Sequence, residues 1–366
     1  MDYIDNEFIK NLIIFDAHCD TANKLIENSI NFKKNNCHLD LEKISLGNLK
    51  AQIFALWVDP LFSGNNPSDI AMMLLDALEK KIFSLGYGTK VNSIRDMNLS
   101  LKNNTLACWI FLEGGHILEN SIKKLEFFHS LGIKGLTITH NKNTDWADSS
   151  SDSPRWDGLN KRGVKFLYKL DELKMIVDVS HSSDKTIMDI MEVYSKPIMA
   201  SHSNSRCLCN IERNLPDNII SDIGVNGGYI GVNFFPGFLN KKIFNQIMKN
   251  LDIYKEEYNE KIKENKEKPD FIRRLEYDLS SKLIKNNDYL DLNVVIDHIV
   301  HISDIGGIDI VGLGSDFDGI PSTPMDLKNV SFYPNLIEGL IERGFNFNEI
   351  KKIMGLNLYN FLKKFE

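Results

Sequence analysis

The sequence contains few cysteines and no long apolar run. Its 366 residues include five cysteines, an odd and scattered set that does not form a disulfide framework. No window approaches the roughly 20 apolar residues that span a bilayer. The acidic start Met1–Asp5 lacks the basic and apolar regions of a signal peptide. We therefore expect a reduced, cytoplasmic protein that does not associate with a membrane.

Positive charge and nucleotide-binding motifs are also scarce. The net charge of −7 gives no reason to expect nucleic acid as a partner. The sequence has no Walker A loop and no Ser-His-Asp elbow, and Gly224–Gly228 precedes an apolar run, whereas a dinucleotide-binding loop follows one. Cys207 and Cys209 lack the second cysteine pair of a zinc ribbon. These absences argue against nucleotide-dependent and serine-hydrolase chemistry.

What the sequence does contain is a series of short apolar runs that each end on a polar residue. The runs are rich in β-branched and aromatic residues, which is typical of strands. Stretches with apolar residues three and four positions apart separate most of the runs and predict helices. The eight predicted strands cover residues 12–21, 52–59, 106–113, 135–140, 175–181, 197–202, 229–234 and 310–316.

Alternating strands and helices imply parallel strands joined by right-handed crossovers. Eight such units are the number in a closed (β/α)8 TIM barrel, so we predict one barrel domain over residues 1–366, with an open doubly wound sheet as the alternative. Residues 239–289 are dense in Lys and Glu and interrupt the pattern. We interpret them as a helical excursion between the last two strands, with either a solvated face or a role at the site or in a second-subunit contact. Residues 332–361 should form closing helices, broken at Arg343-Gly344.

The polar residues at the strand ends are the candidates for chemistry. In a barrel they would all face the C-terminal mouth, where barrel active sites lie. Four of the nine histidines end separate apolar runs, although any one of them alone could be a structural core residue. The strand-end residues are His18, Asp20, Asp59, Glu113, His140, His181, His202, Asn233 and Asp316.

Several imidazoles beside carboxylates suit a divalent ion such as zinc. His18 and Asp20 are two positions apart on a strand, so both point the same way, whereas Cys19 should face away. One catalytic zinc normally takes three protein ligands, so the surplus predicts two metals bridged by a carboxylate. Glu113 is the natural bridge, because it follows a very apolar run and a buried carboxylate needs a compensating partner. The alternative is an exposed glutamate at a strand end.

Two arginines and two aspartates near the strand ends add further candidates. Arg206 and Arg213 could each hold a substrate carboxylate or form a surface salt bridge. Asp316 ends the last strand and is the better general acid or base. Asp318 is expected to hydrogen-bond the loop backbone.

Taken together, these residues resemble the renal (membrane) dipeptidase family, metallopeptidase family M19 of the amidohydrolase-like barrels. The resemblance implies that His18 and Asp20 bind one zinc ion and that His181 and His202 bind the other, with Glu113 bridging both. The matching motifs span nearly the whole chain in order, at residues 16–20, 111–115, 136–148, 177–181, 201–203, 213–217, 314–319 and 355–357.

The resemblance also implies roles in catalysis. His140 would stabilise the oxyanion, Arg213 would hold the C-terminal carboxylate of a dipeptide, and Asp316 would shuttle the proton. Phe238 stands where some members place a tyrosine near the substrate, which removes a hydroxyl donor. Mammalian members also carry a secretion signal and a lipid anchor, neither of which we expect here.

We therefore predict a binuclear zinc dipeptidase that uses a hydroxide shared by its two zinc ions. One alternative is another amide hydrolase of this barrel type, acting on an N-acyl amino acid, a cyclic amide or a lactam. A second alternative is a metal-binding barrel without turnover. A homodimer is compatible with the sequence, although no feature establishes one.

Overall fold

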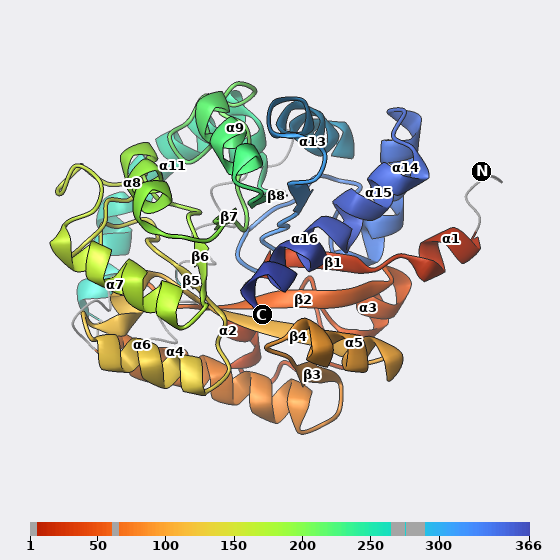
Figure 1. Ribbon diagram of the computed structural model, residues 1–366, viewed down its shortest axis with the longest axis horizontal. Coiled ribbons are helices and arrows are strands. Elements are labelled where there is room, and N and C mark those ends of the chain that lie inside the picture. Colours follow the sequence, from red (N-terminus) through yellow and green to blue (C-terminus); the bar gives the residue numbers. More distant parts are fainter. Residues whose placement is uncertain (1–5, 61–65, 265–274, 276–289) are drawn as a thin grey trace.

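A parallel β-sheet lies at the centre of the computed structural model, which describes residues 6–60, 66–264, 275 and 290–366 (Figure 1). The strands follow the order β2-β1-β9-β8-β7-β6-β5-β4-β3, and β2 also pairs with β4. That extra pairing closes eight strands into a barrel. The strands are β1 (Ile14–Cys19), β2 (Leu49–Trp57), β3 (Gly88–Lys90), β4 (Leu106–Glu113), β5 (Gly135–Thr137), β6 (Ile176–Asp178), β7 (Met199–Ala200), β8 (Tyr229–Val232) and β9 (Val311–Leu313).

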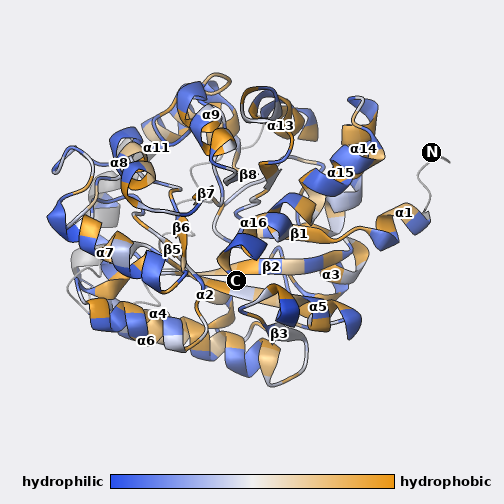
Figure 2. Ribbon diagram, in the orientation of Figure 1, coloured by the Kyte–Doolittle hydropathy of each residue, from blue (hydrophilic) through white to orange (hydrophobic). Residues whose placement is uncertain are grey.

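Helices surround the strands, and their apolar faces cover the barrel. Figure 2 shows mainly hydrophobic strands at the centre, whereas the outer helices carry hydrophobic and hydrophilic residues side by side. The helices are α1 (Asn6–Asn11), α2 (Thr21–Leu25), α3 (Leu41–Leu46), α4 (Pro67–Leu78), α5 (Ile94–Lys102), α6 (Ile122–Ser130), α7 (Lys161–Glu172), α8 (Asp184–Val193), α9 (Asp217–Val225), α10 (Pro236–Leu239), α11 (Lys241–Glu264), α13 (Leu292–Gly306), α14 (Tyr333–Glu342), α15 (Phe347–Lys351) and α16 (Asn357–Leu362).

The predicted (β/α)8 barrel is confirmed, and the open sheet is wrong. Each of the eight predicted strands overlaps one barrel strand. The additional strand β3 was not predicted, because Gly88-Thr89-Lys90 has no apolar pattern and both Thr89 and Lys90 are exposed. It pairs with the start of β4 and lies outside the closed ring.

The predicted helical excursion is confirmed as far as it is described. α10 and α11 follow β8, while residues 265–274 and 276–289 lie outside the described part of the chain. The break at Arg343-Gly344 is also confirmed, since it separates α14 from α15 and Gly344 has a φ of +99° that favours glycine. Among the described helices, none is both long and apolar enough to cross a bilayer.

The C-terminal segment packs against the N-terminal ends of the strands. A Cβ on Gly355 would lie 2.1 Å from the carbonyl oxygen of Ile13, so only glycine permits this approach to β1. Asn357 donates side-chain hydrogen bonds to the carbonyls of Ile308 and Val311, at 2.7 and 2.8 Å. This end of the barrel is therefore filled, and the opposite, C-terminal end holds the polar residues.

Candidate metal centre

Five predicted metal ligands come together at the C-terminal ends of the strands. Each follows or ends a buried strand, so the surrounding apolar residues fix its position, and all five side chains are buried. Such polar groups are costly to bury unless hydrogen bonds or metal ions compensate them. The five are His18 on β1, Asp20 after β1, Glu113 at the end of β4, His181 after β6 and His202 after β7.

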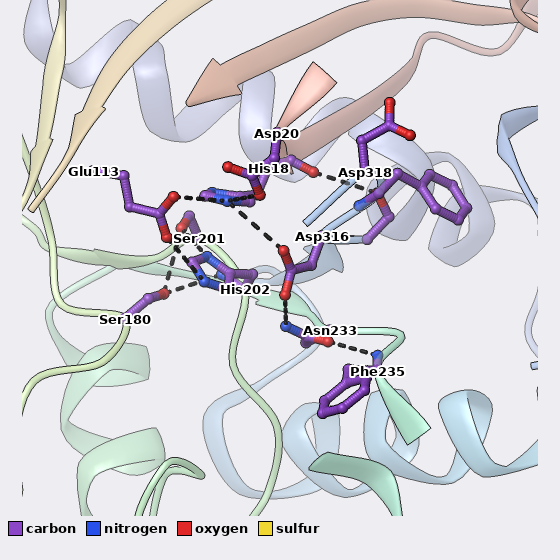
Figure 3. A network of polar contacts seen from close by, with 12 residues as sticks. His18, Asp20, Glu113, Ser180, Ser201, His202, Asn233, Phe235, Asp316 and Asp318 are labelled. Atoms are coloured by element: carbon purple, nitrogen blue, oxygen red, sulfur yellow. Dashed lines mark hydrogen bonds and ion pairs between the residues drawn. The ribbon is translucent and has the colours of Figure 1, made fainter. Parts of the chain in front are cut away.

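The Glu113 carboxylate lies between two sets of ligands. Its Oε2 is 3.4 Å from Nε2 of His18, and its Oε1 is 3.5 Å from Nε2 of His181 and 3.6 Å from Nε2 of His202. Nε2 of His18 is also 3.4 Å from Oδ2 of Asp20. Figure 3 shows Glu113 reaching toward both His18 and His202. The carboxylate predicted as a bridge therefore lies between the two sets of candidate ligands.

The imidazoles of His181 and His202 face each other with their Nε2 atoms 2.9 Å apart. Nδ1 of His181 is 3.1 Å from the amide oxygen of Asn141, and Nδ1 of His202 is 2.7 Å from the hydroxyl of Ser201. An amide oxygen only accepts hydrogen bonds, so Nδ1 of His181 carries the proton and its Nε2 holds a lone pair. A cation that accepts both nitrogen lone pairs fits this geometry.

Two further ligand atoms lack a hydrogen-bond partner. Nε2 of His18 and Oδ1 of Asp20 are both buried and make no hydrogen bond, although each belongs to a strongly polar group. Imidazole nitrogen and carboxylate oxygen are ligands that zinc accepts at about 2.0–2.2 Å. Three overlapping groups of potential ligands occur at the mouth, and Cys19 belongs to none of them. The donor set therefore fits a pair of borderline divalent ions.

The two sets of ligands differ in their electrostatics. Burial alone would lower the pKa of His18, but the carboxylates of Glu113 and Asp20 outweigh it and raise that pKa well above its usual value. Burial lowers the pKa of His181 and His202 well below the usual value, and the charge of Arg213 adds to the effect. His181 and His202 are thus already in the neutral form that binds metal.

Asp316 lies beside the ligands, with its carboxylate held from one side. Its Oδ2 accepts a 2.9 Å hydrogen bond from the Asn233 amide, while its Oδ1 is 4.0 Å from Nε2 of His18. Burial, with the negative charge of Asp20 adding to it, raises the pKa of Asp316 to about 7. That value suits a group that takes up and returns a proton near neutral pH.

Backbone strain occurs at two of these positions. His181 has a φ of +68° and Asp316 a φ of +63°, a region that residues other than glycine rarely adopt. Gly319 allows the last loop to approach β1, because a Cβ there would lie 2.1 Å from Oδ2 of Asp20. Strained residues of this kind cluster at functional sites, where the surrounding structure holds them in place.

His140 is close to the second set of ligands. Its ring centroid is 4.3 Å from that of His181 and 5.4 Å from that of Trp57, which it meets edge-on. Its Nδ1 is buried and has no hydrogen-bond partner. Burial, reinforced by nearby positive charge that includes Arg213, holds the pKa of His140 well below its usual value. A neutral imidazole with an unused nitrogen is therefore available at the mouth of the barrel.

The two candidate arginines have different surroundings. Arg206 forms a bidentate pair with Asp184 at 2.7 Å for both bonds. Arg213 is buried, donates to Oγ of Ser203 at 2.9 Å and to the carbonyl of His202 at 2.8 Å, and keeps its Nε without a partner. Burial lowers the pKa of Arg213 to about 10, which leaves the guanidinium charged at neutral pH. Arg213 thus retains free donors beside the ligands.

Phe238, Asp318 and Asn233 complete the predicted set. The Phe238 ring lies on α10 with its centroid 5.2 Å from Cζ of Arg213, so it packs over the guanidinium. Asp318 accepts hydrogen bonds from the backbone nitrogen of His38 at 2.7 Å and from the Thr21 hydroxyl at 2.6 Å, as expected for a loop residue. The sequence predicts Asn233 only as a strand-end residue, and in the structure it follows β8 and hydrogen-bonds Asp316.

Two polar residues at the site were not singled out from the sequence. Asp178 is fully buried and accepts a 2.7 Å hydrogen bond from Oγ of Ser201, which contacts His202. The signal for Asp178 was its position inside the apolar run 175–179, because a carboxylate there must be compensated. Nothing in the sequence pattern distinguishes Ser201 from other strand-end serines.

Relatives of this chain include several dipeptidases. The chain is 28% identical to Dipeptidase tcpJ of Claviceps purpurea over 341 residues, which cover 90% of this chain and 69% of that protein. It is 29% identical to an uncharacterized dipeptidase of Schizosaccharomyces pombe, and the match covers 98% of this chain and 82% of that protein. Identity to human Dipeptidase 3 is 28%, and there the match covers 89% of this chain and 58% of the relative.

Solved structures share the fold over almost the whole chain. The probable dipeptidase PvdM from Pseudomonas aeruginosa matches with a TM-score of 0.84 and 22% identity, covering 98% of this chain and 96% of the other. A metallopeptidase from Rhodobacter sphaeroides matches with a TM-score of 0.78 and 21% identity, covering 97% and 99%. The profile of the family described as Membrane dipeptidase (Peptidase family M19) matches residues 5–366. The chain therefore belongs to the membrane dipeptidase family, peptidase family M19, and is a peptide-bond hydrolase of the metallopeptidase class.

Proposed function

We propose that this protein is a binuclear zinc dipeptidase. The observation that carries the proposal is the position of Glu113, whose two oxygens face separate sets of ligands at 3.4–3.6 Å. His18 and Asp20 would hold one ion, His181 and His202 the other, and Glu113 both. When bound, two zinc ions lower the pKa of a water to near neutrality and polarise the scissile carbonyl.

The remaining side chains would supply proton transfer and charge stabilisation. Asp316 has one oxygen held by Asn233 and the other directed toward His18, so the second oxygen can accept the proton of the attacking water. As a general acid it would then return that proton to the leaving amine. His140, neutral and with an unused nitrogen, would donate a hydrogen bond to the oxygen on which negative charge develops.

Arg213 would restrict the enzyme to short substrates. Its guanidinium is fixed by Ser203 and the carbonyl of His202, which orients its free donors before a substrate arrives. A carboxylate is the natural partner for such a planar donor group. In support of a dipeptide, the neighbour from Rhodobacter sphaeroides was solved with a phosphinate mimic of the dipeptide L-Ala-D-Ala. We also propose a reduced, cytoplasmic setting, which the five free cysteines support.

The test is a dipeptide panel assayed on protein of known metal content, with Asp316→Asn as the diagnostic variant. We expect about two zinc ions per chain in both proteins and a loss of turnover of roughly 100-fold or more in the variant. Loss of zinc from Asp316→Asn would make Asp316 a ligand instead, since it lies in one group with His18 and Asp20.

Parallel assays separate the alternatives. Hydrolysis of N-acyl amino acids, cyclic amides or lactams without hydrolysis of dipeptides would support a different amide hydrolase on the same barrel. Two bound zinc ions without turnover of any of these substrates would support a metal-binding barrel that is not an enzyme.

A further inference from the structure

Asp178, at the end of β6, is a carboxylate near the metal centre that accepts four hydrogen bonds. Its Oδ2 accepts from Oγ1 of Thr137 at 2.6 Å and from Oγ of Ser201 at 2.7 Å. Its Oδ1 accepts from the backbone nitrogens of Ser180 at 3.0 Å and Ser201 at 2.9 Å. The side chain is fully buried, and these bonds compensate its charge. One carboxylate thus joins the ends of β5, β6 and β7.

The chemistry of these groups fixes the direction of each hydrogen bond. An ionised carboxylate only accepts, so the single hydroxyl proton of Ser201 points to Asp178. Oγ of Ser201 is also 2.7 Å from Nδ1 of His202, and its proton is already committed. Nδ1 of His202 must therefore carry a proton and donate it to Ser201. The lone pair of His202 is then on Nε2, the atom that faces Glu113.

We propose that Asp178 is a positioning residue for the metal centre and acts through Ser201. The chain Asp178–Ser201–His202 selects the imidazole tautomer that can bind zinc through Nε2 and fixes the orientation of the ring. The inference rests on the binuclear centre proposed above. Outer-shell hydrogen bonds of this kind typically change metal affinity 10- to 100-fold when they are removed.

A purely structural role for Asp178 predicts something different. In that case every hydrogen bond to the carboxylate would matter in proportion to its contribution to folding. Thr137 provides a matched control, because its hydroxyl is equally buried and donates to the same Oδ2 at a similar distance, yet it lies outside the path from Asp178 through Ser201 to His202. Ser201→Ala breaks the path to His202, whereas Thr137→Val removes a bond of the same kind from the other side of Asp178.

The first measurement is zinc affinity by competition with a chromophoric chelator, on wild type, Ser201→Ala and Thr137→Val. We expect Ser201→Ala to lower the affinity for one of the two zinc ions 10- to 100-fold and to leave the affinity for the other unchanged. Thr137→Val should bind both as wild type does. Equal affinities in wild type and Ser201→Ala, or an equal loss in both variants, would overturn the inference. Wild type that binds fewer than two zinc ions would instead contradict the proposed function.

The second measurement needs no metal and tests the tautomer directly. Long-range ¹H–¹⁵N correlation spectra of the metal-free wild type, labelled at histidine, report which ring nitrogen of each imidazole is protonated. We expect His202 to be protonated at Nδ1 in wild type and to lose this preference in Ser201→Ala. The Ser201→Thr variant, which keeps a hydroxyl, should restore it. If His202 is protonated at Nε2 in wild type, the proposal that Asp178 acts through Ser201 on His202 is wrong. This result does not depend on whether Ser201→Ala folds.

Discussion

The side-chain amide of Asn233 donates a 2.9 Å hydrogen bond from Nδ2 to Oδ2 of Asp316. The two residues follow neighbouring strands, β8 and β9, and Figure 3 shows Asp316 between Asn233 and His18. The Asn233 amide is itself fixed, because its Oδ1 accepts from the backbone nitrogen of Phe235 at 2.6 Å. One oxygen of Asp316 is therefore oriented by the protein, and the other would be left for the proton transfer that we propose.

Replacing Asn233 with alanine should impair proton transfer and spare the metals. Without the amide, the Asp316 carboxylate can rotate away from the reacting groups, so we expect kcat to fall roughly 10- to 100-fold, part of the 10²- to 10⁴-fold that a positioned acid or base supplies. KM for dipeptides and zinc content should change little. Steady-state kinetics with metal analysis provide the check. The control is Asn346→Ala, which removes the cap of α15, far from the site.

Asn233→Asp adds a sharper expectation about pH. A second carboxylate beside Asp316 disfavours its ionised form, so the pKa of Asp316 should rise further. If ionised Asp316 is the base, the acidic limb of the kcat/KM profile should move to higher pH than in wild type. An unchanged acidic limb would mean that another group controls it.

Arg213→Ala should weaken the binding of substrates that have a free carboxylate. The side chain is buried and retains an unpaired Nε, so its loss removes a charge-assisted contact of about 1.5–3 kcal/mol. We expect KM for dipeptides to rise roughly tenfold or more, and KM for the corresponding dipeptide amides to change little. Equal effects on both substrate types would reject the carboxylate clamp.

Arg206→Ala is the matched control, since this arginine lies in the same loop. Its bidentate pair with Asp184 is partly exposed, and such pairs contribute at most about 1 kcal/mol to stability. We expect no change in KM for either substrate type and a small change in thermal stability.

The strand-end residues were predictable because two simple rules place them. Successive side chains of a strand point to opposite faces, so His18 and Asp20 lie on the same face. Parallel strands in a closed barrel also bring all their C-terminal ends to the same mouth. Those rules need no knowledge of loops, and the five metal-ligand candidates obey them. Glu113 was assigned as a bridge from its apolar surroundings alone, and its carboxylate lies between the two sets.

The remaining features depend on tertiary contacts that the pattern of apolar and polar residues in the sequence does not encode. Arg206 and Arg213 are seven positions apart in one loop, and only the folded path turns Arg213 inward and pairs Arg206 with Asp184. The role of Ser201 depends on the direction of a hydrogen bond to Asp178, a residue from another strand. The short strand β3 is specified by its pairing with β4 and not by its own residues.

Metal binding should release protons in a way that distinguishes the two ligand sets. In the metal-free protein the carboxylates around His18 raise its pKa well above the usual value, so its imidazole is protonated near pH 7. Zinc must displace that proton, whereas the lowered pKa values of His181 and His202 mean that no proton leaves them.

Calorimetric titration of zinc in buffers of different ionisation enthalpy measures this release. We expect about one proton from His18 for the ion held with Asp20. Burial raises the pKa of Asp20 to about 6, so near and below that pH Asp20 should release a further fraction of a proton. The affinity for this ion should therefore rise with pH up to the pKa of His18, by up to tenfold per pH unit. A pH-independent affinity for both ions would show that His18 is neutral before metal binds.

Acid should destabilise the fold through His298, which is not one of the candidate metal ligands. His298 is fully buried on α13 and its Nδ1 accepts a 3.0 Å hydrogen bond from the backbone nitrogen of Ser205. Burial lowers its pKa from 6.5 to about 4. Between these values the unfolded chain binds a proton that the folded protein does not, so stability is complete above pH 6.5 and falls as the pH drops toward 4. The loss is about 3 kcal/mol for one such group.

His298→Asn tests this expectation, because the asparagine oxygen can take the place of Nδ1 as acceptor but does not titrate in this range. Chemical unfolding of the metal-free proteins at intervals from pH 7 to 4.5 should give a steeper decline for wild type than for the variant. The difference in slope should approach one proton, or about 1.4 kcal/mol per pH unit. Parallel declines in the two proteins would mean that His298 does not carry the effect, and that other buried imidazoles such as His116, whose pKa burial also lowers to about 4, account for the whole of it.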